Sequence, residues 1–286
     1  MIRGIILDID GVIIGEKIGV NSPDPHPAVI EALKNIRTKG IFVSLCTAKP
    51  YFAILNIIES AGLNNPHITE GGGVIIDPID KVIVQKHFIE SSVASKIIDG
   101  YLKNGVYTEF YTIDNYFIQK DQYSDITEKH SHILQRKPII VKSLSKEALS
   151  SEMVKIMPIA KDEADKRRLI NIFKPFEGRL TLSWGVHPVA LPLQFGIITA
   201  YGISKEQSEQ ELSKGLNISF EEMLGVGDST SDWQFIKLCS YAAAMGNASE
   251  ELKKLVLSKG EKFSYIGPTV DENGILEIFK HFQLAF

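Results

Sequence analysis

Residues 1–15, MIRGIILDIDGVIIG, place two acidic residues at the end of an apolar run. The segment GIILDI predicts a buried strand of a parallel sheet, with Asp8 and Asp10 at its carboxyl end. Because alternate residues of a strand share one side, both carboxylates are expected to face one site. Two carboxylates so close repel each other unless a cation lies between them. The stretch therefore predicts a metal-dependent site where open α/β sheets bind their ligands.

The composition is that of a globular protein with one large or two modest domains. The 286 residues are 44% hydrophobic and 23% charged, and the formal net charge of -4 offers no basic field. We therefore expect neither a nucleic acid nor a membrane as partner. The protein is expected to be a monomer or a homodimer. No signal peptide and no uncharged apolar stretch of about 18 residues is visible. Cys46 and Cys239 are too few for a disulfide framework and lack metal-type spacing. With no signal peptide visible, a reducing cytoplasm is the expected location.

Strand and helix patterns alternate in the two flanking parts of the chain. The predicted elements are strand 4–9, helix 26–40, strand 41–48, helix 50–62, a short strand, glycine turn and strand over 67–76, helix 204–215, strand 223–228, helix 231–239, strand 241–246, helix 249–260 and helix 273–282. Such alternation with short connections predicts a doubly wound parallel α/β sheet of the Rossmann-like kind.

The pattern changes between about residues 81 and 197. Here the predicted elements are helix 91–105, strands 106–112 and 116–120, helix 123–135, strand 138–142, a short helix near Ser145, strand 153–159, helix 161–174 and strand 179–184. We interpret this region as an α+β domain inserted into the first. The expected boundaries are 1–82 and 198–286 for the catalytic core and 83–197 for the insert.

Reactive side chains follow several predicted strands of the flanking parts. In chain order they are Asp8 and Asp10, then Thr47, then Lys205 in a first helical turn, and finally Asp228 and Asp232. Taken singly, each is equally typical of a helix cap, a strand residue or a turn. Together, a carboxylate nucleophile, a hydroxyl, a lysine and further acids around a cation suit phosphoryl transfer.

These motifs resemble those of the haloacid dehalogenase-like phosphatases. DIDGV (8–12) resembles their first motif, LCTAK (45–49) the second, GISKE (202–206) the third and GVGDSTSD (225–232) the fourth. AMGNA (244–248) and NGI (273–275) match late glycine turns of Cof-like members. The insert is similar to the large B-type cap of the Cof-like, sucrose-phosphatase and phosphomannomutase branch. The resemblance implies a Rossmann-like core with a cap that determines specificity.

The resemblance also implies roles for single residues. Asp8 would be the nucleophile that becomes an aspartyl phosphate. Asp10 would protonate the leaving group and then activate water. The phosphoryl oxygens would be held by Thr47, Ala48 and Lys205. Lys49 stands where relatives often have Arg, which changes the shape of the phosphate pocket.

The family further implies Mg2+ as cofactor. Its ligands would be Asp8, the backbone carbonyl of Asp10 and Asp228, with Asp232 in a supporting place. Ser231 stands where relatives usually have Asn before the last acid of the fourth motif, so an amide donor is lost there.

We expect the substrate to be a small phosphorylated metabolite, most readily a sugar phosphate, because a large cap excludes macromolecules. Trp184 and His187, in SWGVHPVALPLQ, are candidates to contact it from the cap. His130 and His132 are interpreted as a surface pair rather than a zinc site. Two alternatives to the phosphatase stay open: a sugar phosphomutase of the phosphomannomutase kind, and a non-catalytic ligand-binding protein on the same scaffold.

Overall fold

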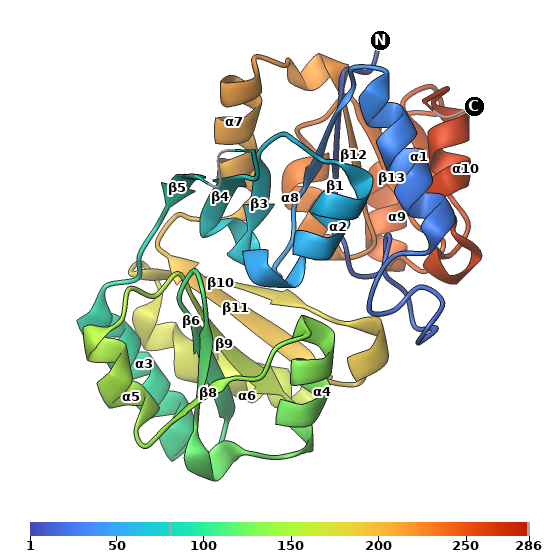
Figure 1. Ribbon diagram of the computed structural model, residues 1–286. Coiled ribbons are helices and arrows are strands. Elements are labelled where there is room, and N and C mark those ends of the chain that lie inside the picture. The colour runs from blue at the N-terminus through green and yellow to red at the C-terminus, as the bar shows by residue number, and fades with distance from the viewer. Residues whose placement is uncertain (80–81, 285–286) are drawn as a thin grey trace.

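The central element of the fold is a five-stranded parallel sheet with the strand order β14-β13-β12-β1-β2 (Figure 1). The computed structural model describes residues 1–79 and 82–284. The strands are β1 (Gly4–Leu7), β2 (Phe42–Leu45), β12 (Met223–Gly227), β13 (Tyr241–Ala244) and β14 (Ser264–Ile266). β1 is flanked by β12 and β2, so its carboxyl end lies between the carboxyl ends of two neighbouring strands.

Helices cover both faces of this sheet (Figure 1). One face packs against α1 (Pro27–Thr38), α2 (Leu55–Ala61) and α10 (Ile275–His281), and the other against α7 (Lys205–Leu216), α8 (Trp233–Ile236) and α9 (Glu250–Leu257). Ile5 and Leu7 belong to the first core and Ile6 to the second, as strand alternation requires. The apolar run of β1 is thus explained by burial on both faces, and the predicted doubly wound α/β class is confirmed.

A second sheet has six strands in the order β10-β11-β9-β6-β7-β8. They are β6 (Tyr107–Tyr111), β7 (Tyr116–Gln119), β8 (Ile139–Val141), β9 (Lys155–Ala160), β10 (Leu180–Gly185) and β11 (Gln194–Ala200). All pairs are antiparallel except β7 with β8. One face packs against α3 (Ser91–Lys103), α5 (Leu144–Glu147) and α6 (Glu163–Phe173). The other face packs against α4 (Asp125–Leu134) and the loop after β2.

Three short antiparallel strands connect the two sheets: β3 (His67–Thr69), β4 (Val74–Asp77) and β5 (Val82–Lys86). The six-stranded sheet lies across the carboxyl ends of the parallel strands (Figure 1). The expected boundary after residue 82 falls in β5, and the one before residue 198 falls in β11.

Several predicted elements differ in detail. The helix predicted over 50–62 is a 3-10 turn, Tyr51–Ala53, followed by α2, and that over 231–239 is the turn Thr230–Asp232 followed by α8. The strands β5 and β14 were not predicted. β14 has only three residues, too few for a recognisable pattern, and pairs with β13. The surface interpretation of the histidine pair is wrong for His130, which is buried, while His132 is exposed.

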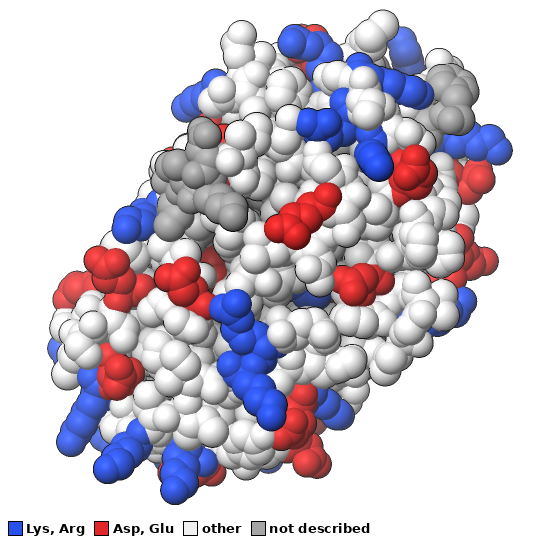
Figure 2. Space-filling model, viewed as in Figure 1, with Lys and Arg blue, Asp and Glu red and all other residues white. Residues whose placement is uncertain are grey.

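Basic and acidic side chains are both spread over the face that Figure 2 shows, in keeping with a net charge near zero. Within residues 1–79 and 82–284, no helix combines the length and apolar character needed to cross a bilayer. Cys46 and Cys239 are free and fully buried.

Candidate active site

Asp8 and Asp10 lie directly after β1 but face different neighbours. The Asp8 backbone N–H still donates to Val226 O across the sheet (3.1 Å), so Asp8 is held at the strand end. Gly11 follows with φ +78°, and a Cβ there would stand 1.9 Å from Asp228 Oδ2. The tight turn therefore requires glycine, and it brings the first acidic motif against the turn after β12.

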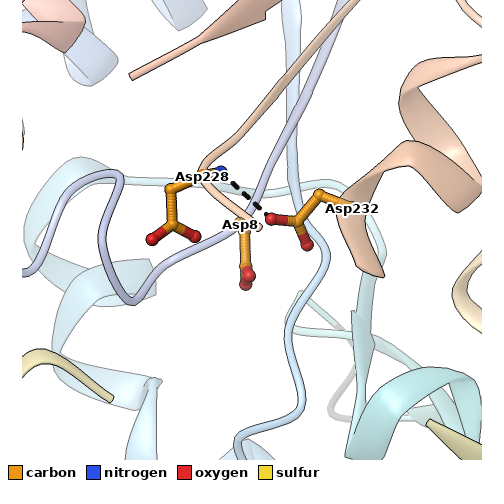
Figure 3. A group of neighbouring side chains, drawn as sticks. All are labelled: Asp8, Asp228 and Asp232. Carbon is orange, nitrogen blue, oxygen red and sulfur yellow. Dashed lines mark hydrogen bonds between the residues drawn. The ribbon is translucent and has the colours of Figure 1, made fainter. Parts of the chain in front are cut away.

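Three carboxyl groups converge at this turn (Figure 3). One oxygen each of Asp8, Asp228 and Asp232 lies within 4.8 Å of the others. Burial and the Asp232 charge raise the pKa of Asp8 to about 8. Burial, then Asp232 and Asp8, raise the pKa of Asp228 well above its usual value. The cluster thus holds more negative charge than its surroundings stabilise, which is the condition that a divalent cation relieves.

Asp232 has protein partners on both of its oxygens, as does Asp8, whose Oδ1 accepts from Ile9 N–H (2.8 Å) and whose Oδ2 lies 3.1 Å from Lys205 Nζ. Asp232 Oδ1 contacts Lys205 Nζ at 2.7 Å, and Asp232 Oδ2 accepts from the backbone N–H groups of Asp228 (3.1 Å) and Ser229 (3.0 Å). Burial alone would raise the pKa of Asp232, but the lysine charge overrides it and the pKa is lowered. Asp232 therefore shapes the loop and anchors the lysine.

Lys205 is the first residue of α7 and is buried. Ser204 caps the helix by accepting from Gln207 N–H, which fixes where the first turn begins. Lys205 Nζ lies 3.1 Å from Asp8 Oδ2 as well as bonding Asp232. Burial would lower the pKa of this ammonium, but Asp232 and Asp8 raise it above its usual value. A permanent positive charge is thus fixed beside Asp8.

Asp10 contacts one residue from the loop after β2 and one from the inserted region. Its Oδ1 lies 2.9 Å from Lys49 Nζ and 3.1 Å from His187 Nε2. Lys49 comes from the loop after β2 and His187 from the segment after β10. Burial would raise the pKa of Asp10, but Lys49 and His187 hold it below its usual range. His187, a candidate to contact the substrate, thus contacts Asp10 directly.

The loop after β2 carries Thr47 and Ala48. Thr47 is buried, and its Oγ1 accepts from Lys49 N–H (3.1 Å), which orients the lysine toward Asp10. Thr47 lines one cavity together with Asp8, Lys205 and Asp228. Ala48 lines this cavity and a second one that also contains Asp10.

The structure brings together eight of the nine predicted site residues. They are Asp8, Asp10, Thr47, Ala48, Lys205, Asp228, Asp232 and His187. Trp184 lies farther from Asp10: it lines neither of these two cavities but a third one that includes Asp228. Lys166 Nζ lies over its ring, 5.4 Å from the ring centre.

Sequence reasoning missed several neighbours of these residues. Lys49 pairs with Asp10, and its position after Thr47-Ala48 was the available signal. Asn247, in the AMGNA stretch, donates to Gly11 O at 2.9 Å and lies 3.5 Å from Asp228 Oδ2. Its own Oδ1 accepts from Val270 N–H (2.8 Å). Asn247 therefore ties the first and fourth motifs to a late loop.

A buried ion pair connects the six-stranded sheet to the loop after β2. Lys155 Nζ, on β9, lies 2.5 Å from Glu70 Oε2, donates to Ala48 O (2.7 Å) and lies over the Tyr111 ring. Both charged side chains are at most 1% exposed. Burial lowers the pKa of Lys155 and raises that of Glu70.

We predict that Lys155→Met lowers the free energy of unfolding by about 3–5 kcal/mol, because it leaves the Glu70 carboxyl group buried without a partner. Urea denaturation measures the change. The exposed pair Lys103–Asp99 provides the control, since Lys103→Met should cost less than about 1 kcal/mol. The double variant Lys155→Met/Glu70→Leu should recover part of the loss. Equal stability of Lys155→Met and the wild type would contradict the prediction.

Fold and site together define a hydrolase family. The chain belongs to the haloacid dehalogenase-like hydrolases, whose family model matches residues 5–279. It is 24% identical to the phosphatase YwpJ of Bacillus subtilis (strain 168) over 97% of this chain and 98% of that one. It is 24% identical to a phosphoglycolate phosphatase of Methanospirillum hungatei over 89% and 88% of the two chains. The predicted family is confirmed.

Solved structures support the fold. A sugar phosphatase of haloacid dehalogenase subclass IIB, BT4131, superposes with a TM-score of 0.79 at 22% identity, covering 99% of both chains. The structural likeness extends over the parallel sheet and the insert alike, and it confirms the predicted α/β class with an inserted α+β region.

Proposed function

We propose that the protein is a Mg2+-dependent phosphatase that hydrolyses a small phosphorylated metabolite, a sugar phosphate by preference, through an aspartyl phosphate on Asp8. The carrying observation is the placement of Asp8 between the Lys205 ammonium and the Asp228 carboxyl group, at the end of a central strand. The phosphatase names of relatives over nearly the whole chain support the reaction class.

In the proposed first step, an Asp8 oxygen attacks phosphorus and the bond to the leaving oxygen breaks. For this step Asp10 carries a proton, which it donates to that oxygen on the side of the cavity where the leaving group would lie, and Asp10 is left as the carboxylate. In the second step Asp10 takes a proton from water as the water attacks phosphorus and frees Asp8. Lys49 and His187 stabilise the carboxylate form of Asp10, which is the form that acts as base.

Phosphoryl oxygens would be held on the Asp8 side of the site. Lys205 places a positive charge there, and Thr47 and Ala48 line the same cavity. Because these groups are fixed by the sheet edge and by a helix cap, they need little rearrangement as charge moves onto the phosphoryl oxygens.

The acidic cluster fits a hard divalent cation, because the atoms that converge there are carboxylate oxygens. Asp8 and Asp228 would bind it directly together with the backbone carbonyl of Asp10, and Asp232 would support the loop. When bound, Mg2+ supplies positive charge that reduces the repulsion between the attacking carboxylate and the phosphoryl oxygens.

The proposal extends to the organisation of the chain. We propose that residues 1–82 and 198–286 form the catalytic core and that 83–197 form a cap that selects the substrate. His187 supports this division, because a residue of the insert reaches the catalytic Asp10. We also propose a cytoplasmic location, which the two free buried thiols support.

Removal of the metal tests the proposal. We expect exhaustive chelation to lower the release of inorganic phosphate at least about 100-fold, and added Mg2+ to restore it. Ca2+ should not restore it, since its looser coordination misplaces the attack. Asp228→Asn should require a higher Mg2+ concentration for half-maximal rate. Full activity after chelation would contradict the metal requirement, and an isomeric phosphate as product would indicate a mutase.

A further inference from the structure

A cavity beside Asp10 is lined mainly by the six-stranded sheet and α4. Its wall includes apolar side chains, among them Ile133, Met157 and Phe195, and a few polar ones, among them Asp10 and His130. In ligand sites of this kind the few polar groups fix the orientation of the ligand. Asp10 already has a place in the proposed reaction, whereas His130 has none.

His130 is held rigidly in the wall of this cavity. Its Nδ1 lies 2.8 Å from Glu109 Oε2. Glu109 is fully buried on β6 and also accepts hydrogen bonds from the hydroxyl groups of Tyr107 and Tyr111. The imidazole ring packs 5.2 Å from the Phe195 ring centre. A carboxylate and a histidine buried this way are costly, and their contact with each other offsets part of that cost.

The geometry leaves one ring nitrogen free for a ligand. Because Nδ1 faces the Glu109 carboxylate, the proton of a neutral ring resides on Nδ1 and Nε2 is an acceptor. Among the described residues, none forms a hydrogen bond with His130 Nε2. A hydroxyl group can donate to this nitrogen, or accept from it if the ring is protonated.

The charges on the same wall argue against an acidic ligand. Lys155 is paired with Glu70, and Lys49 with Asp10. His130 faces Glu109, and His187 faces Asp10. Among the described residues that line this cavity, each lysine and histidine therefore has a carboxylate partner, with Lys49 and His187 sharing that of Asp10. A carboxylate on the ligand would find no unpaired cation, whereas a hydroxyl group requires none.

We propose that His130 is a specificity residue that binds a hydroxyl group of the leaving group, so that the substrate is a phosphorylated polyol or sugar rather than a phosphorylated carboxylic acid. The inference rests on the phosphatase function proposed above, since it is the position of Asp10 that places the leaving group in this cavity. Glu109 is the positioning residue that sets the ring.

Matched substrates and matched variants test the site. The substrates are glycerol 1-phosphate with n-propyl phosphate, sorbitol 6-phosphate with n-hexyl phosphate, and phosphoglycolate. His130→Asn retains a nitrogen near the place of Nδ1 for Glu109 but removes Nε2. His132→Asn changes the exposed histidine of the same helix and serves as the control. Thermal unfolding verifies that each variant is folded.

In the wild type we expect kcat/KM for the better polyol phosphate to exceed that of its alkyl partner about tenfold or more, as expected for a buried hydrogen bond. His130→Asn should remove most of this ratio by slowing the polyol phosphate, while His132→Asn should leave it unchanged. His130→Gln, whose amide reaches the place of Nε2, should restore part of it. It also serves as the test should His130→Asn fail to fold.

The outcomes separate this proposal from the phosphatase function. If phosphate is released but the ratio is absent in the wild type or unchanged in His130→Asn, the His130 site is refuted and the phosphatase stands. A preference for phosphoglycolate that depends on His130 also refutes it. Calorimetric binding of sorbitol 6-phosphate adds a readout without turnover. If the folded wild type releases no phosphate, His130-dependent binding refutes only the phosphatase, and its absence refutes both.

Discussion

Asp8→Asn is expected to abolish phosphate release, with a loss on the order of 10⁴-fold or more, because a neutral amide does not attack phosphorus. Asp8 lies directly after β1, contacts the Lys205 ammonium and belongs to the acidic cluster. The measurement is inorganic phosphate released per active protein, with the best substrate of a screen of phosphorylated sugars, polyols and nucleotides.

The same substitution should leave the fold intact. Burial and Asp232 raise the pKa of Asp8 to about 8. At neutral pH the folded chain therefore binds more protons at Asp8 than the unfolded chain, so this carboxyl group opposes folding, and increasingly so as the pH rises above its unfolded pKa. A neutral amide should not lower the melting temperature of the metal-free protein. Asp24→Asn, at an exposed aspartate, is the matched control and should retain full turnover. Undiminished phosphate release by a pure Asp8→Asn preparation would refute the nucleophile.

Asp10→Asn is expected to show a loss that depends on the leaving group. A sugar alkoxide leaves poorly, so losing the general acid should slow its transfer roughly 10²–10⁴-fold. A nitrophenolate leaves without a proton, so the first step with p-nitrophenyl phosphate should slow far less. The second step still needs Asp10 as base. Rapid mixing should therefore show a burst of nitrophenol, close to one per active site, followed by slow turnover.

The burst distinguishes a catalytic role of Asp10 from a structural one. Lys49 and His187 both contact Asp10 Oδ1, so the substitution also removes the partner of two cationic groups. If damage to this contact were the only effect, both substrates would lose rate equally and no burst would form. That result would make Asp10 a residue that positions its neighbours and not an acid–base catalyst.

The sequence alone was sufficient for the parallel sheet and for the residues at its edge. Apolar runs such as GIIL are buried from both faces in a doubly wound sheet, so their strands are recognisable without partners. Parallel strands end at one edge, so Asp8, Thr47 and Asp228 were predicted to meet, and the structure places all three on one cavity. Lys205 was predictable for a local reason as well, since Ser204 caps the helix that carries it.

Helix α4 shows where local pattern and tertiary structure diverge. Thr127, His130 and Leu134 lie three and four residues apart and form its buried face, but a histidine at such a position is also compatible with a solvent-exposed helix. Only the packing of α4 on β6 brings Glu109 to the ring, across 21 residues of sequence. The expected surface pair was wrong for His130 because its carboxylate partner was not visible in the helix.

The contacts between the two sheets were decided by the tertiary structure alone. His187 reaches Asp10, and Lys155 reaches Glu70 and Ala48, across separations of 85 residues or more. Periodicity and capping report the neighbours of a residue within a turn or a strand, whereas these pairs depend on how one sheet lies on the other. The sequence by itself therefore determined the family, the parallel sheet and the residues at its edge. Tertiary structure decided which cations hold Asp10 and which polar groups line its cavity, because a buried charge must find its partner in space rather than along the chain.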